Sequence, residues 1–134
     1  HELLRNWARG SGVNLDEGAR SAAPYYVRTA ENYMETYAKD VPSLGEVALA
    51  SGVSVRALTG AFKRFRGITP GQFLRERRLE GVRASLLSAL PGETVTQIAS
   101  EWGYVNFGIF AKVYRERFGE NPSHTLGRAT KINL

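Results

Sequence analysis

Two stretches of this sequence follow one pattern: SLGEVALASGVSVRALTGAFKRFRGITP runs from Ser43 to Pro70, and TVTQIASEWGYVNFGIFAKVYRERFGENP runs from Thr94 to Pro122. Few of their letters are identical. When they are offset by 51 residues as far as their turn glycines, and by 52 residues beyond, residues of one kind fall at equivalent positions. This agreement in type and order predicts one motif used twice. The pairs are Ser43 with Thr94, Glu46 with Gln97, Ala48 with Ala99, Gly52 with Gly103, Ser54 with Asn106, Leu58 with Phe110, Phe62 with Tyr114 and Gly67 with Gly119.

Each copy is predicted to be a short helix, a turn and a second helix. A capping residue followed three positions later by Glu or Gln, as in Ser43 and Glu46, marks the start of the short helix. Gly52 suits the turn because glycine adopts positive φ at little cost. Leu58 would hold the second helix against the first, which gives helix-turn-helix spacing. The alternative is two helical hairpins that pack together for stability alone.

The rest of the sequence predicts an all-α fold. Prolines punctuate the chain, and the apolar residues between them recur every three or four positions, which is the helical period. We expect about seven helices, arranged as two helix-turn-helix subdomains (about 43–66 and 94–118) joined by a long linker helix (about 70–90). Residues 1–23 are predicted to be a linker or the tail of a missing companion domain, and residues 24–134 the domain itself.

The charge of the chain favours an anionic partner. The 134 residues carry a formal net charge of +5, with 43% hydrophobic and 23% charged residues. Residues 44–90 hold 8 basic and 3 acidic groups, whereas residues 1–43 hold 5 and 6, and residues 91–134 hold 5 and 4. A basic segment of this kind suits nucleic acid, but a solvated basic surface accounts for it equally well.

Several other kinds of protein find little support in the sequence. It has no cysteine, which excludes disulfides and thiolate metal sites and agrees with a cytoplasmic location. No apolar run approaches the ~20 residues that span a membrane, and no signal peptide is recognisable. The sequence does not begin with Met, so we expect a piece of a longer protein.

The second helix of each copy is predicted to have an apolar face and an opposite, outward face. The apolar faces hold Leu58, Ala61, Phe62 and Phe65 in the first copy and Phe110, Val113, Tyr114 and Phe118 in the second. On the outward faces the repeat pairs Arg56 with Gly108, Gly60 with Lys112, and Lys63 with Arg115. Basic outward faces on a repeated helix-turn-helix indicate DNA binding.

These motifs resemble the DNA-binding domain of AraC/XylS-family bacterial transcription regulators. The resemblance rests on ASGVSVRALTGAFKR, VTQIASEWGY and FAKVYRERFGENPS, together with Gly67, Thr69, Pro70, Arg78 and Leu79. It implies two helix-turn-helix units on one linker helix that read neighbouring major grooves of duplex DNA, about one turn or ~34 Å apart. It also implies contact with RNA polymerase, usually as an activator, and a separate effector-binding or dimerisation domain.

The outward residues coincide with positions at which that family reads bases. Arg56 is the first candidate, because arginine can fork onto guanine O6 and N7; a solvated arginine is the alternative. Lys112, which the repeat pairs with Gly60, is the matching candidate in the second copy. Phe107 is either a contact to a thymine methyl group or a core residue. The base-reading candidates are Arg56, Thr59, Gly60, Phe107, Gly108, Ala111 and Lys112.

Two of these candidates, Gly60 and Gly108, stand where the family often has larger polar side chains. Either the backbone approaches DNA closely there, or the protein reads fewer bases directly. We expect DNA shape to carry part of the specificity. A further set of residues is predicted to meet phosphates, which set affinity and register. The phosphate candidates are Ser43, Lys63, Arg64, Arg66, Thr94 and Arg115.

No pattern of residues suggests catalysis, a metal or a cofactor, so the protein is not expected to be an enzyme. Two rival functions stay open at this point. One is a helical adaptor that binds proteins on the same scaffold without DNA. The other is an architectural DNA binder without sequence preference, which would show steep salt dependence but little specificity.

Overall fold

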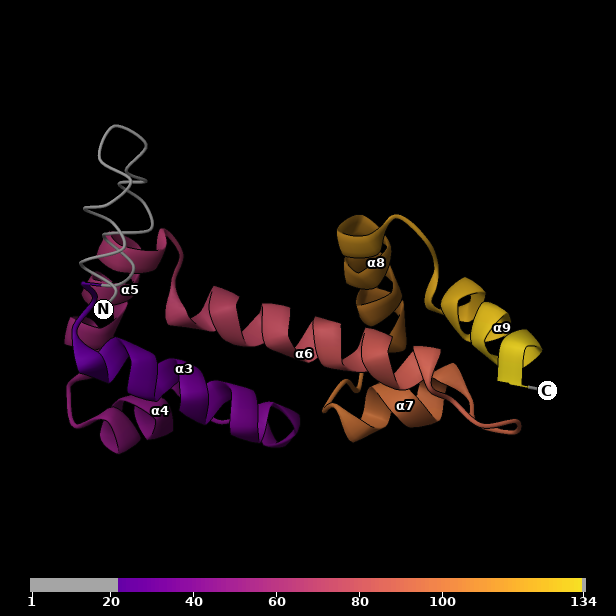
Figure 1. The fold of residues 1–134 in the computed structure, drawn as a ribbon, viewed down its shortest axis with the longest axis horizontal. Helices are drawn as coiled ribbons and strands as arrows, with labels where there is room; N and C mark the ends of the chain where they lie inside the picture. The colour runs from indigo at the N-terminus through magenta and orange to yellow at the C-terminus, as the bar shows by residue number, and fades with distance from the viewer. Residues whose placement is uncertain (1–21, 134) are drawn as a thin grey trace, which may run out of the picture. The chain divides into compact units, whose positions relative to one another are not determined.

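The computed structural model describes residues 22–133, and within that range the chain forms seven α-helices, one short 3-10 helix and no strand (Figure 1). The predicted all-α fold is confirmed. No helix in the same range is long and apolar enough to cross a membrane. The helices are α3 (Tyr25–Tyr37), η2 (Ala38–Asp40), α4 (Leu44–Ser51), α5 (Val55–Arg66), α6 (Pro70–Leu87), α7 (Val95–Glu101), α8 (Phe107–Phe118) and α9 (Pro122–Asn133).

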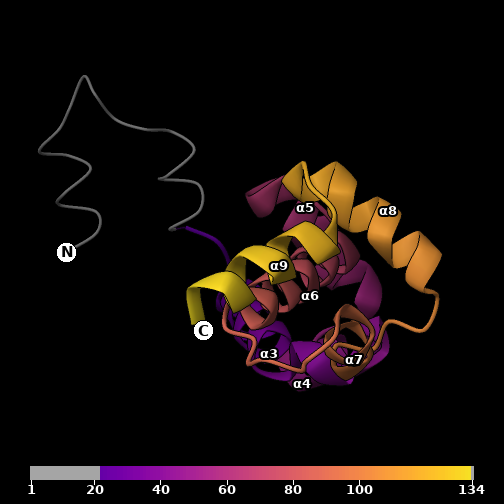
Figure 2. The same cartoon turned by 90° about the vertical axis from the view of Figure 1, so that its right-hand side faces the viewer.

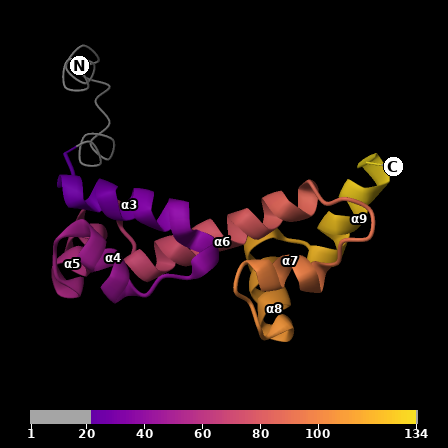
Figure 3. The same ribbon diagram turned by 90° about the horizontal axis from the view of Figure 1, so that it is seen from below.

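Apart from its last two residues, the predicted tail at residues 1–23 lies outside the described residues, and a domain boundary there stays a prediction. The described chain divides into two compact units. Unit 1 holds the described residues up to Met34 with Ser43–Phe73, and unit 2 holds Glu35–Pro42 with the residues from Leu74 onward. Figure 3 shows α4 and α5 beside α3 in unit 1, and Figure 2 shows the short connection from α7 into α8 in unit 2. Each unit contains one copy of the repeated motif.

In unit 1, local hydrogen bonds fix the ends of both motif helices. Ser43 and Glu46 form the predicted capping box: each side chain accepts a hydrogen bond from the backbone N–H of the other, at 3.0 and 2.7 Å. Ser54 caps α5 by accepting from the N–H of Ala57 at 3.0 Å. The turn between the helices begins at Gly52, whose φ of 77° is strained for any residue with a side chain.

Unit 2 repeats these devices with other residues. Thr94 and Gln97 form the second capping box, at 3.1 and 3.0 Å, and Asn106 caps α8 by accepting from the N–H of Ile109 at 3.0 Å. Gly103 lies in the turn with a φ of 84°. The predicted starts of both motif helices are therefore confirmed, and each follows from interactions within four residues.

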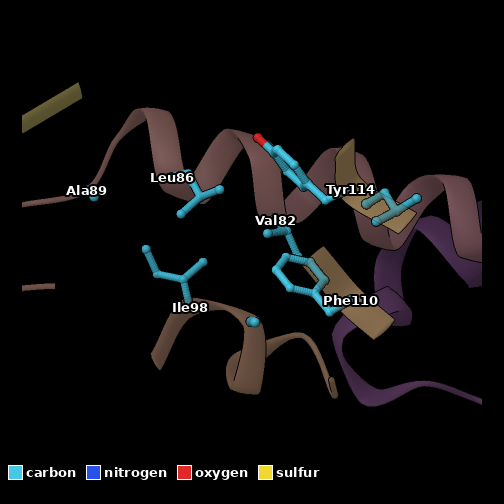
Figure 4. Close-up of a cluster of buried hydrophobic side chains, with 8 residues drawn as sticks. Val82, Leu86, Ala89, Ile98, Phe110 and Tyr114 are labelled. Atoms are coloured by element: carbon cyan, nitrogen blue, oxygen red, sulfur yellow. The ribbon is translucent and has the colours of Figure 1, made fainter. Parts of the chain in front are cut away.

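The core of unit 2 forms where α6, α7 and α8 meet. Val82 and Leu86 extend from α6 toward Ile98 of α7 and Phe110 of α8 (Figure 4). The ring centroids of Phe110 and Tyr114 lie 5.8 Å apart, so successive turns of α8 add aromatic rings to this core. The buried set is Leu79, Val82, Leu86, Ala89, Ile98, Ala99, Phe110 and Tyr114.

Trp102, the residue that follows α7, is attached to α6 by three contacts. Its ring lies so close to Gly81 that a Cβ at that glycine would fall 2.1 Å from the indole. Its Nε1 donates to the Ser85 hydroxyl at 3.1 Å. Its backbone carbonyl accepts from Nε and Nη2 of Arg78 at 3.2 and 3.0 Å. Arg78 thus supports the structure by holding the turn that leads into α8.

A chain of hydrogen bonds attaches α9 to α8. The Tyr114 hydroxyl donates to the Thr125 hydroxyl at 2.8 Å, and Thr125 donates in turn to the Glu120 carboxylate. Glu120 also pairs with Arg128 at 2.5 Å and with Arg83 at 3.4 Å. Thr125 is fully buried, so this chain satisfies a hydroxyl group that would otherwise destabilise the core.

Two glycine-to-alanine substitutions should change the stability of the fold in opposite directions. Gly81→Ala should lower the free energy of unfolding by about 1–3 kcal/mol, because a rigid ring occupies the position of the new methyl group. In α9, a Cβ at Gly127 would meet nothing within 4 Å. Gly127→Ala should therefore raise the free energy of unfolding by about 0.5–1 kcal/mol, because alanine has the higher helix propensity. Urea denaturation measures both, and a gain in stability for Gly81→Ala would contradict the packing described.

Glu120 predicts a loss of stability in acid. Hydrogen bonds from Arg128 and Thr125 lower the pKa of its carboxyl group from 4.5 to about 2. A pKa that is lower in the folded state stabilises the fold above the unfolded value, and this contribution is lost as the pH falls through the folded value. Glu120→Gln should therefore flatten the decline in stability between pH 4.5 and about 2.

Urea denaturation across that pH range measures the effect. The matched control is Glu116→Gln, because Glu116 lies on α8, is exposed and forms no ion pair with any described residue. Identical pH profiles for the wild type and Glu120→Gln would show that the carboxylate does not contribute.

Candidate nucleic-acid interface

The predicted base-reading positions lie on the sides of α5 and α8 that face away from the two cores. Arg56 and Gly60 are exposed on α5, as are Gly108 and Lys112 on α8. Phe107 is 37% exposed, which separates it from the fully buried Phe110 and makes it a surface residue at the start of α8. Thr59 and Ala111 are half-buried on the flanks. All seven are accessible to a partner, and their contact with bases stays a prediction.

Acidic partners divide the cationic side chains of residues 22–130 into two groups. Arg56, Lys63 and Arg64 of α5 and Lys112 of α8 form no ion pair with any residue in that range. The other cations there without an ion pair are Arg28, Lys39, Arg75, Arg78 and Arg115. Those paired with a glutamate are Arg66, Arg77, Arg83, Arg117 and Arg128. Cations without an acidic partner keep their attraction for an external anion, so the exposed Arg56, Lys63, Arg64 and Lys112 offer positive charge on the outward faces of α5 and α8.

Arg66 differs from the other predicted phosphate contacts because Glu31 of α3 already binds it. Nε of Arg66 lies 2.5 Å from Oε2 of Glu31, and Nη2 donates to Oε1 at 3.1 Å. The two side chains are only 15% and 18% exposed. This forked pair joins α3 to α5 within unit 1, and a phosphate would have to compete with it.

The remaining phosphate candidates are available in different degrees. Lys63 and Arg64 are exposed, and the Arg64 guanidinium lies 5.3 Å from the centre of the Phe65 ring. Arg115 is exposed and donates to the side-chain oxygen of Asn121 at 3.1 Å, which fixes it beside the end of α8. The hydroxyl groups of Ser43 and Thr94 accept hydrogen bonds from their own helices, and their protons stay available to an anion.

The two outward glycines are not required by packing. A Cβ at Gly60 would meet nothing within 4 Å, and one at Gly108 would meet only the side-chain oxygen of Asn106, at 3.6 Å. Each glycine costs its helix about 1 kcal/mol relative to alanine. The fold therefore offers no internal reason for these glycines, and their effect is to leave backbone open on the outward faces.

A groove of about 790 Å³ runs along one flank of α5 in unit 1. The start of α3 contributes Pro24 and Tyr26, and α5 contributes Arg56, Gly60 and Arg64 among its lining. Sequence reasoning missed this groove because it needs two helices that are some thirty residues apart in the chain. Arg56 and Arg64 line the groove together with small residues such as Gly60, so an anion can approach α5 closely there.

Sequence reasoning also missed two exposed apolar residues near the start of α8. Val105, in the turn, is 88% exposed, and Ile109, in the first turn of the helix, is 62% exposed. Only Phe107 between them had been singled out. The sequence did hold a signal for their exposure. In the run VNFGI the apolar residues do not share the helical spacing of the core residues Phe110 and Tyr114.

Comparison with known sequences identifies related proteins. The pattern of a family described as a helix-turn-helix domain matches residues 47–128. A probable thc operon regulatory protein of Rhodococcus erythropolis is 40% identical over 108 residues, covering 80% of this chain and 32% of the relative. A XylDLEGF operon transcriptional activator of Pseudomonas putida is 34% identical over 109 residues, covering 81% of this chain and 34% of the relative. The chain thus spans about a third of the length of these relatives.

Solved structures agree with the sequence relatives. A probable AraC family transcriptional regulator from Rhodopseudomonas palustris is 36% identical with a TM-score of 0.73, covering 80% of this chain and 99% of that one. A regulator from Chromobacterium violaceum, described as containing an AraC-type DNA-binding domain, is 26% identical with a TM-score of 0.72, covering 78% and 91%. The shared fold includes both helix-turn-helix units.

The pair between Arg66 and Glu31 predicts that Arg66 stabilises the fold more than its neighbour Lys63 does. Arg66→Ala should lower the free energy of unfolding by about 1–3 kcal/mol, because it leaves a mostly buried carboxylate without its partner. Lys63→Ala removes the same charge from an exposed side chain and should change it by less than about 0.5 kcal/mol. Urea denaturation compares them, and equal midpoints would mean that the ion pair does not support unit 1.

Proposed function

The chain belongs to the AraC/XylS family of transcription regulators, and from that premise we propose that it binds duplex DNA sequence-specifically and regulates transcription initiation as an activator. In this proposal α5 and α8 are the recognition helices, and each enters a major groove. The short helices α4 and α7 position them through the capped turns described above. The domain extends over residues 24–134, with α6 as the helix that links the two readers.

The observation that carries the proposal is the position of the cations that lack an acidic partner. Arg56, Lys63 and Arg64 lie on α5 and Lys112 on α8, each exposed and without an ion pair among the described residues. By contrast, Arg66, Arg77, Arg83, Arg117 and Arg128 are paired with glutamates. A surface that leaves these charges uncompensated on both repeated helices suits a polyanion that contacts both.

Within this interface the side chains have separate roles. Arg56 forks onto a guanine, and Lys112 contacts a base acceptor in the second groove with less directional precision. Thr59 and Ala111, on the flanks, complete the contact to neighbouring base edges. Lys63, Arg64 and Arg115 bind phosphates, joined by Ser43 and Thr94 at the starts of α4 and α7. Gly60 and Gly108 let the DNA approach the backbone, so that groove shape contributes to selection.

Activation requires partners beyond DNA. The relatives from Pseudomonas putida are named as operon transcriptional activators, and we extend that role to this chain together with contact to RNA polymerase. The chain spans about a third of those relatives, so the proposal includes a companion domain that binds an effector or dimerises. It places the protein in the cytoplasm with the chromosome and assigns it no enzymatic activity.

Selection of bound duplexes from a random DNA pool at near-physiological salt tests the proposal. Enrichment of a site with two preferred blocks supports two sequence-reading units on one chain. Binding without enrichment would favour an architectural DNA binder instead, because phosphate contacts alone carry no sequence preference. The absence of any duplex binding would favour a protein-binding adaptor.

Two substitutions on α5 should separate base reading from phosphate binding. Arg56→Ala should cost about 1–3 kcal/mol on the preferred site and relax the preference at one base pair. Lys63→Ala should weaken binding to all sequences alike and reduce the salt dependence by about one ion. Titrations of selected and scrambled duplexes at several salt concentrations measure both. If Arg56→Ala weakens the two duplexes equally, Arg56 is a phosphate contact.

A further inference from the structure

Three exposed apolar side chains lie within five residues at the start of α8. Val105, Phe107 and Ile109, which we call the apolar ridge, are 88%, 37% and 62% exposed. Single exposed apolar residues are common on protein surfaces and need no explanation. Three within five residues, at the start of a proposed recognition helix, are candidates for contact with its partner.

The ridge has few polar groups beside it. From Val105 to Ala111 the only side chain that can form hydrogen bonds is that of Asn106. Its oxygen already accepts the N–H of Ile109 at 3.0 Å, which caps α8. The first outward charge is that of Lys112, one turn further along. The start of α8 therefore offers a partner mainly apolar contact, and its hydrogen-bonding capacity is small.

Ile109 borders the outward face of α8, whereas Phe107 lies on the other side of Gly108. Ile109 and Lys112 are three residues apart and lie on the same side of the helix. Gly108 lies between Phe107 and Ile109, and its missing side chain leaves the backbone open there, with only Asn106 near the position of a Cβ. A partner that contacts Lys112 can therefore also reach Ile109, and the open backbone at Gly108 lets it approach Phe107.

The chemistry of the major groove restricts what such a surface can recognise. Base edges there present hydrogen-bond donors and acceptors, and the one apolar group among them is the C5 methyl group of thymine. Exposed Val, Phe and Ile side chains cannot discriminate between donors and acceptors. An apolar ridge that enters a major groove can gain specific contact only from thymine.

The equivalent part of α5 is different. The residues that correspond to the ridge are Val53, Val55 and Ala57, which offer less apolar surface, and Arg56 lies among them in place of Gly108. Of these, Val55 is 41% exposed. The two copies of the motif thus present different chemistry at equivalent positions. Unit 1 presents the guanidinium group of Arg56, and unit 2 presents apolar surface.

We propose that unit 2 reads thymine through its methyl group, with Val105 and Ile109 as specificity-determining residues beside Phe107. This inference rests on the proposed function. The block of the binding site that unit 2 contacts is then rich in thymine, and its recognition depends on the methyl groups more than on hydrogen bonds to the bases.

Replacing thymine with deoxyuridine tests the proposal, because it removes the methyl group and leaves every hydrogen-bonding group in place. The full 134-residue chain and the duplex selected from the random pool are used. The block read by unit 2 is identified as the one whose preference is lost in Lys112→Ala. Each deoxyuridine at a contacted position should raise Kd about fourfold, the value expected for one buried methyl group.

Variants connect the effect to the ridge. Ile109→Ala and Val105→Ala should bind the thymine and deoxyuridine duplexes with nearly equal Kd, and alanine at these exposed positions leaves the cores untouched. Leu90→Ala is the matched control, because Leu90 is 66% exposed in unit 2 and lies outside the helix-turn-helix. It should keep the full fourfold discrimination.

The outcomes separate this inference from the proposed function. If the chain selects a site but deoxyuridine in the second block leaves Kd unchanged, unit 2 does not read methyl groups, and the ridge belongs to a different contact. If Ile109→Ala and Val105→Ala both keep the discrimination, other residues make it and the assignment is wrong. If no duplex is selected at all, the proposed function fails first and this inference fails with it.

Discussion

The contact between the Trp102 ring and Gly81 is the constraint on which the second helix-turn-helix depends. Gly81 lets the indole lie against the backbone of α6, since a Cβ there would fall 2.1 Å from the ring. Arg78 and Ser85, on the same side of α6, bind the carbonyl and the Nε1 of the tryptophan. The end of α7 is thereby fixed in position and rotation, and α8, which starts a few residues later, takes its orientation in unit 2 from this contact.

Unit 1 reaches the same motif by other means. The residue that corresponds to Trp102 is Ser51, whose buried hydroxyl donates to the Val47 carbonyl at 2.8 Å. Attachment comes instead from the forked pair of Arg66 with Glu31. The repeat therefore preserves the helices, their caps and their turn glycines, while the interactions that hold each copy to its surroundings have diverged. The outward faces have diverged in parallel, which suits a pair of readers that recognise two different sequences.

Charge has a structural use and a binding use in this chain, and partners distinguish the two. Several arginines that join helices are paired with glutamates, as with Arg117 and Glu76, where the guanidinium lowers the pKa of the carboxyl group. Arg56 and Lys112 on the recognition helices have no such partner among the described residues. The net charge of +5 therefore does not show which cations are available to a partner, because a cation paired with a glutamate attracts an external anion less than an unpaired one.

The sequence by itself determined the repeat, the all-α class, the starts of the helices at Ser43, Thr94 and Asn106, and the apolar faces of α5 and α8. These follow from local physics: a cap needs residues three positions apart, and helical periodicity assigns a face without knowledge of the partner. The base-reading residues that it predicted are all accessible, because outward faces follow from the same periodicity. Only the tertiary structure decided that Arg66 is held by Glu31, that Gly81 accommodates Trp102, that Pro24 and Tyr26 border a groove on α5, and that Val105 and Ile109 stay exposed. Each of these features depends on which distant segments of the chain pack against a residue or leave it uncovered. Burial and pairing between distant segments have no local signature in a sequence.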